Sequence, residues 1–294
     1  MRFDFRRALL VLGFAGPLLT SCASIPGFAN PSVRVQARLW ADTARGDANS
    51  SAPAGSGAPV GGQNVPLNDL GLDDRGDDIG GLFHLGDGFS GVEFLYQGVD
   101  LFDSSPNVLP FAYGVLPAAS LINSNLEMNE YRLGYIGEVF DHEFVFGEED
   151  EEEYVNIRLG AGVEVAHRDG DFDVFEVAIP DPDLPEIIET GLTNSLSFSD
   201  GGAFYGKVRG RVSWRQFALQ ADFAFSPDLV LGGPVEGPLN DTEIQARYTF
   251  FEQGLTLFLG YRRSQFELQD NVQGTAFNAD FVIDGFLAGA EFEF

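Results

Sequence analysis

The sequence predicts an all-β protein that forms a single antiparallel up-and-down transmembrane β-barrel of about ten strands. Three observations lead to this fold class. Segments of about 9–11 residues with alternating apolar and polar side chains recur along the chain. Tight turns and long connections alternate between these segments. After the N-terminal region, no stretch reaches about 18 consecutive apolar residues, so strands rather than helices must cross a bilayer.

The predicted strands are residues 32–42, 79–86, 89–101, 126–139, 154–167, 203–214, 216–225, 242–251, 255–268 and 279–294. The alternation is clearest from Val155 to Val165 and from Phe217 to Phe225, where every second residue is apolar. The high content of glycine (36) and phenylalanine (28) fits many short amphipathic strands joined by turns.

The connections predict the topology. Residues 87–88, 215 and 252–254 are tight turns, whereas 43–78, 102–125, 168–202, 226–241 and 269–278 are long loops. Short periplasmic turns and long external loops are typical of membrane barrels. The connection 140–153 is the exception, because it should be a short turn yet contains the acidic run 148–153. The apolar third loop, 168–202, extends the barrel, folds into its mouth or contacts a partner.

The N-terminus predicts export. A region with three arginines among its first seven residues precedes the apolar segment 8–19, which is too short to span a membrane. Residues 19–22, Leu-Thr-Ser-Cys, resemble the bacterial lipobox, which implies a signal peptide at 1–21 and lipidation of Cys22. Cleavage after Ala29, which would discard Cys22, is the alternative. We therefore expect a linker at 22–31 and the barrel at 32–294.

The net charge of −28 limits the partners. Nucleic acid is excluded, because the chain has no basic patch to neutralise phosphates. The acids of the long loops predict diffuse contact with divalent cations that bridge lipopolysaccharide, although their spacing is not that of an EF-hand. Outer-membrane lipid is the expected surrounding.

The last residues carry a resemblance to a known class. Residues 288–294, Ala-Gly-Ala-Glu-Phe-Glu-Phe, resemble the C-terminal strand of bacterial outer-membrane β-barrel proteins. The resemblance implies that Phe292 and Phe294 are recognised by the barrel-assembly machinery, and that the protein lies in the outer membrane. Residues 67–74, Leu-Asn-Asp-Leu-Gly-Leu-Asp-Asp, are similar to a segment of uncharacterised barrels of this type and imply class membership without an activity.

The strand phase places a set of charged residues on the inward face. This predicted lumen network consists of Arg34, Arg38, Arg132, Arg158, Lys207, Arg209, Arg211, Arg247, Arg262, Glu93, Glu130, Glu164, Asp222 and Glu243. One interpretation is that paired Arg and Glu side chains fill a narrow interior. The alternative is that Lys207, Arg209 and Arg211 form a basic ladder along a narrow anion-preferring channel.

Catalysis has little support in the sequence. Ten-stranded omptin proteases carry acidic residues and a His-Asp pair at the outer rim, and Asp77, Asp78, His167 and Asp169 lie at comparable strand ends without reproducing the omptin motifs. No hydrolase, P-loop or metal-ligand spacing is present, so we assign no catalytic residue, cofactor or metal. The expected function is a structural or surface-interaction role, with the channel and a rim hydrolase as alternatives.

Overall fold

The computed structural model describes residues 31–51, 62–72, 76–102, 106–146, 153–177, 189–199, 202–226, 235–250, 254–272 and 275–294. The predicted signal peptide, Cys22 and the linker up to residue 30 lie outside these residues. Among the described residues, no helix has the length and apolar character needed to cross a membrane.

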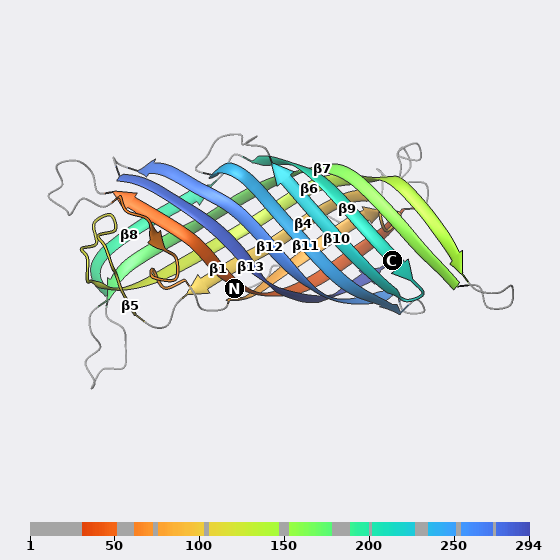
Figure 1. Cartoon of the computed structure of the whole chain (residues 1–294), viewed down its shortest axis with the longest axis horizontal. Helices are drawn as coiled ribbons and strands as arrows, with labels where there is room; N and C mark the ends of the chain where they lie inside the picture. Colours follow the sequence, from red (N-terminus) through yellow and green to blue (C-terminus); the bar gives the residue numbers. More distant parts are fainter. Residues whose placement is uncertain are drawn as a thin grey trace, which may run out of the picture.

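Ten long strands form a closed antiparallel ring (Figure 1). In ring order they are β1 (Ser32–Ser51), β3 (Gly76–Gly86), β4 (Gly91–Phe102), β6 (Leu121–Phe146), β7 (Glu153–Val177), β9 (Ala203–Trp214), β10 (Phe217–Ser226), β11 (Val235–Phe250), β12 (Leu255–Val272) and β13 (Thr275–Glu293). Pairing of β13 with β1 closes the ring. The predicted fold class is therefore confirmed, and each ring strand corresponds to one predicted strand.

Three further strands lie at the end that carries the long connections. β8 (Glu189–Ser199) pairs with the outer part of β7, directly beyond the stretch of β7 that pairs with β9. The described part of the third loop thus extends the barrel wall. β2 (Val65–Pro66) and β5 (Asn107–Val108) are short strands that pair with β1 and β6.

Several predicted boundaries were wrong. Residues 269–272 and 275–278 of the predicted fifth loop are strand, because the pairing of β12 with β13 continues to Val272 and Thr275. The exceptional turn 140–153 is largely strand, because β6 and β7 remain paired as far as Phe146 and Glu153. Figure 1 shows this hairpin reaching past the neighbouring turns. β4 begins at Gly91 rather than at Phe89.

The polarity of the barrel wall reverses along the strands. In the half nearer the short turns, apolar residues face outward and charged residues inward: on β7, Val163 is 65% exposed and Glu164 only 4%. Nearer the long connections the sense is opposite, since Phe172 of the same strand is buried while Asp171 is exposed. We call the half nearer the short turns the lower half and the half nearer the long connections the upper half. The lower half has the apolar exterior of a membrane barrel, whereas the upper half has the polar exterior and apolar interior of a water-soluble barrel.

Aromatic side chains mark both edges of the apolar belt. Tyr131 lies with its ring centroid 5.3 Å from that of Tyr96 and 6.2 Å from that of His167 on the outer side. At the edge of the belt nearer the short turns, which we call the inner girdle, the ring centroid of Phe217 lies 6.5 Å from that of Trp214 and 4.9 Å from that of Tyr248. Such girdles are typical of the two membrane–water interfaces.

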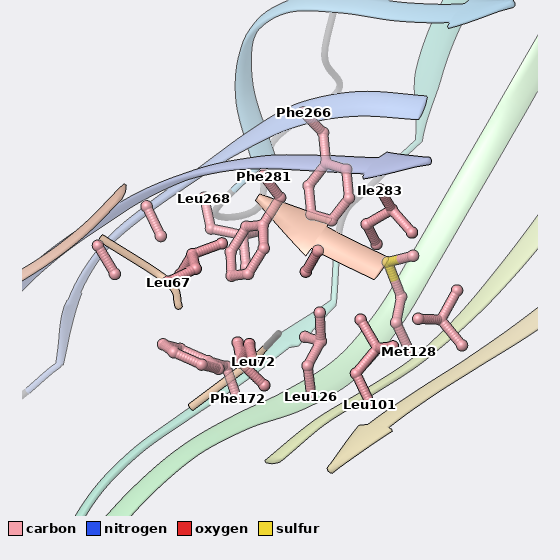
Figure 2. Packing of buried hydrophobic residues seen from close by; sticks show 14 of the residues in the cluster. Leu67, Leu72, Leu101, Leu126, Met128, Phe172, Phe266, Leu268, Phe281 and Ile283 are labelled. Carbon is pink, nitrogen blue, oxygen red and sulfur yellow. The ribbon is translucent and has the colours of Figure 1, made fainter. Parts of the chain in front are cut away.

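The upper half of the lumen is filled by an apolar cluster (Figure 2). Leu67 and Leu72 from the first connection pack against Phe172, Leu126 and Phe281 of the wall, and Figure 2 shows these side chains pointing toward one another. Within the described residues, Leu109, Tyr113 and Leu116 of the second connection join this cluster, and β8 of the third loop contributes Leu196 and Phe198. The leucines of the first connection are those of the segment 67–74 that resembles other barrels.

Candidate functional site

The lower half of the lumen holds all residues of the predicted lumen network. Alternation along β1, β4, β6, β7 and β9–β12 points their side chains inward, because the opposite face of each strand carries the apolar belt. Every member except Arg211 forms an ion pair with another described residue. Most of these pairs form three groups. Arg132 Nη1 lies 3.0 Å from Glu164 and joins the first group to the second, and Arg158 pairs separately with Glu138.

The first group centres on Glu93 of β4. Arg209 Nη1 lies 2.6 Å and Lys207 Nζ 2.9 Å from its carboxylate oxygens. Lys207 also lies 3.2 Å from Glu164, and Arg209 Nε lies 2.6 Å from Asp222. Two cations of β9 therefore share three carboxylates: Glu164 and Asp222 lie on the strands next to β9, and Glu93 lies across the lumen on β4.

The second group lies above the first and centres on Glu130 of β6. Its carboxylate oxygens lie 2.8 Å from Arg132, 2.6 Å from Arg168 and 2.5 Å from Arg262. Asp241 lies 2.8 Å from both Arg132 and Arg262, which closes a ring of alternating charges. The Arg262 guanidinium also stacks over Trp40, 4.9 Å from the ring centroid.

The third group lies toward the short turns. Arg38 pairs with Glu243, and Gln245 joins Glu243 to Arg247. Arg247 then lies 2.7 Å from Glu291 of β13. Most of these charges are buried, so each depends on its partners to offset the loss of hydration.

The turn between β3 and β4 closes the lumen from below. Asp87 Oδ1 accepts hydrogen bonds from the backbone N–H groups of Phe89 (2.9 Å) and Ser90 (2.7 Å), which folds the turn inward. Phe89 is fully buried, and Arg158 stacks on its ring at 4.5 Å from the centroid. Phe89 was predicted to lie in a strand, and its closing of the lumen was not predicted.

Little space remains between these side chains. The cavity lined by the lumen network has a volume of about 50 Å³, which is room for a few water molecules. Above it, the apolar cluster fills the mouth; burial there raises the pKa of Tyr113 well above the ordinary value of a phenol. The described lumen is thus occupied at two levels by side chains of opposite character.

Three site residues escaped the sequence analysis. Arg168 and Asp241 lie one residue beyond their predicted strands, yet both are buried in the second group. His84, to which the sequence pattern gave no role, has its Nδ1 3.2 Å from Glu93. Glu164 and Ala166 are even-numbered residues whose side chains point into the lumen. Extending this alternation by two residues would have predicted that Arg168 also points inward.

The rim residues that would suit a hydrolase do not converge. His167 and Asp169 project from the outer face of β7, with His167 Nε2 3.8 Å from Asp169 Oδ1. Asp77 also faces outward, whereas Asp78 is buried inside, where it accepts the N–H of Asp100 at 3.0 Å. Within the described ranges, no three His, Cys, Asp or Glu side chains are grouped so that they could hold a metal ion.

The closed ring, the outward apolar belt, the two aromatic girdles and the charged lumen together define a transmembrane β-barrel of the outer-membrane class. This architecture places the chain in an outer membrane. No protein-family model matches the sequence, and no curated protein matches it.

Comparison with solved structures finds barrels of low sequence identity. The outer membrane protease OmpT from Escherichia coli is 11% identical, over 89% of this chain and 97% of that one, with a TM-score of 0.46. The P. putida toluene transporter TodX is 8% identical over 90% of each chain, with a TM-score of 0.33. A Pseudomonas aeruginosa FadL homologue is 10% identical over 89% and 90%, with a TM-score of 0.32. Values this low carry no activity over to this chain.

Proposed function

We propose that this protein is a closed outer-membrane barrel that works through its outer surface rather than by conduction or catalysis. The observation that carries the proposal is the double closure of the lumen. An ion-pair network leaves a cavity of about 50 Å³, and an apolar cluster covers it. A permeating anion would have to break buried ion pairs and then cross an apolar layer, and either step is costly.

Conductance measurements test this proposal. The purified barrel should give no ion channels in planar bilayers, and neither should a variant in which a short Gly-Ser linker replaces residues 62–72. The linker variant removes the part of the apolar cluster that comes from the first connection. It should still be closed, because the charge network fills the lumen below the mouth. Reproducible channels in the wild type would overturn the proposal.

Lipopolysaccharide bridged by divalent cations is the partner that the outer wall suits. Just above the outer girdle, Asp100 of β4 is paired across the sheet with Glu127 of β6, and Glu127 with Asp171 of β7. All three side chains are exposed. Like charges directly opposite one another destabilise a sheet unless counter-ions neutralise them. Mg²⁺ or Ca²⁺ ions that also bind lipid phosphates would neutralise these three carboxylates just above the outer girdle.

The partner is tested by the thermal stability of the barrel in lipopolysaccharide-containing vesicles. Millimolar Mg²⁺ should raise the melting temperature of the wild type and should raise that of the double variant Glu127→Gln, Asp171→Asn by less than half as much. Glu143→Gln, which removes an exposed acid from the opposite end of β6, should respond like the wild type. An equal response in vesicles of phosphatidylcholine alone would contradict a role for lipopolysaccharide.

A further inference from the structure

A second cavity opens at the inner mouth of the barrel, below the closed lumen. Its volume is about 200 Å³, and Arg34, Arg211, Arg247, Ser213, Thr249 and Thr256 contribute donors to its lining. Two carboxylates, Glu291 and Glu293, share the wall. The site is independent of the proposed surface role, because it lies at the opposite end of the molecule.

Arg211 has neutral hydrogen-bond acceptors only. Its Nε donates to Gln220 Oε1 at 3.0 Å, and its Nη1 donates to the Gly88 carbonyl at 3.1 Å. In the part of the chain that the structure describes, it makes no ion pair. The neighbouring inward cations of β9, Lys207 and Arg209, are both paired with Glu93, so the predicted basic ladder ends in one uncompensated charge.

The rest of the pocket does not neutralise that charge. Arg34 lies 3.0 Å from Glu293 and 3.6 Å from Glu291, and Arg247 lies 2.7 Å from Glu291. Three guanidinium groups thus share two carboxylates. Arg34 Nε is buried and has no hydrogen-bond partner among the described residues.

The turn at Gly88 brings two of these cations together. Arg34 Nη1 donates to the Gly88 carbonyl at 2.6 Å, so Arg34 of β1 and Arg211 of β9 converge on one oxygen atom. Gly88 has a positive φ of 86°, and a Cβ atom there would lie 1.9 Å from Arg34 Nη2. The backbone at this position therefore leaves room for the guanidinium groups.

We propose that this pocket binds a small oxyanion, with the phosphate group as the chemical class and Arg211 as its principal ligand. Arg211 Nη1 and Nη2 each keep one N–H beyond those that bond Gly88 and Gln220, and a planar guanidinium can donate such a pair to one oxyanion. The Ser213 hydroxyl adds a donor, and the Thr249 and Thr256 hydroxyls, which bond each other at 2.9 Å, leave one more between them. The phosphate belongs either to a free periplasmic solute or to a lipid headgroup, since Phe217 of the inner girdle also lines the pocket.

The test compares the purified wild type with Arg211→Gln and with Arg263→Gln, a control that removes an exposed arginine from β12. Inorganic phosphate in detergent, against sodium chloride of equal ionic strength, should bind the wild type and the control saturably in calorimetry. Arg211→Gln should weaken this binding at least tenfold. Ser213→Asp, which supplies an internal counter-charge, should abolish it and keeps the test decisive should Arg211→Gln not fold.

A second experiment, carried out without inorganic phosphate, distinguishes a lipid headgroup from a free solute as the source of the phosphate. Melting temperatures are measured in nanodiscs of phosphatidylcholine with and without phosphatidylglycerol. Stabilisation by phosphatidylglycerol that disappears in Arg211→Gln assigns the site to a lipid headgroup, whereas binding in detergent alone assigns it to a solute. The proposal is overturned if neither arm distinguishes Arg211→Gln from Arg263→Gln.

Discussion

Arg209 and Glu93 form a two-pronged ion pair across the lumen, with Arg209 Nη1 2.6 Å and Nη2 3.0 Å from the two carboxylate oxygens. The pair joins β9 to β4, which are not neighbours in the ring. It therefore braces the barrel across its interior, where the backbone hydrogen bonds of the wall cannot act.

Removing one partner of this pair should destabilise the barrel. Arg209→Ala leaves Glu93 and Asp222 with less compensation in a buried site, and such a loss typically costs about 3–5 kcal/mol. The variant should lose its heat-modifiable gel mobility at a lower temperature than the wild type. Arg263→Ala, on the outside of β12, should change nothing measurable. Equal stability of wild type and Arg209→Ala would indicate an open, hydrated lumen.

Arg211→Gln should behave in the opposite way. Because Arg211 has no carboxylate partner among the described residues, its removal leaves no buried acid uncompensated. In phosphate-free detergent, its melting temperature should equal or exceed that of the wild type. A loss as large as that of Arg209→Ala would mean that Arg211 is a structural cation.

The apolar cluster at the mouth should contribute to stability without controlling permeability. Leu70 is fully buried in the first connection, and replacing a buried leucine by alanine typically costs about 2–5 kcal/mol. Leu70→Ala should therefore lower the denaturant midpoint, measured by tryptophan fluorescence. Conductance should stay at background, because the charge network below is intact. Asn64→Ala, an exposed change in the same connection, is the matched control.

The depth of the membrane can be mapped by single arginines. Leu259 faces outward within the apolar belt and is 68% exposed, so Leu259→Arg should cost about 2–4 kcal/mol of stability in lipid vesicles. Asn278→Arg, also outward but above the reversal of polarity, should cost almost nothing. Similar costs at both positions would show that the membrane boundary does not lie at the reversal of polarity.

Surface labelling tests the orientation. In a Cys22→Ser background, Gln63→Cys should react with an impermeant thiol reagent on intact cells, since it lies in the first long connection. Arg215→Cys, in the turn between β9 and β10, should react only after the outer membrane is permeabilised. The reverse pattern would invert the topology.

The N-terminal lipid anchor remains a prediction, because Cys22 lies outside the described residues. A fatty-acid analogue supplied to growing cells should label the wild type and not Cys22→Ser. An unlabelled wild type that begins at Asn30 would show ordinary cleavage instead.

Much of the fold could be predicted because lipid-facing strands have a regular pattern. The odd-numbered apolar residues from Val155 to Val165 do face outward, and Glu164 faces inward. The prediction ended these strands early, because the apolar phase changes from odd to even between Val165 and Phe172. A phase change usually marks the end of a strand, but here it marks the membrane surface.

The site was only partly predictable for a different reason. Strand phase indicates which side chains face the lumen, but it does not say which of them meet across it. The partner of Arg209 is Glu93, which is far away in sequence and on a strand that is not adjacent. The inward fold of Phe89 depends on a turn geometry that two residues, Asp87 and Gly88, do not specify by themselves.

The reversal of polarity also bears on how the barrel leaves the membrane. Sliding the chain back toward the periplasm would pull Asp171 and its charged neighbours through hydrocarbon, at about 2.5–3.5 kcal/mol for each acidic side chain. Extraction from the membrane is therefore slowed by a kinetic barrier, in addition to any equilibrium stability of the folded barrel. The inserted protein should persist under conditions in which its unfolded form would not reinsert.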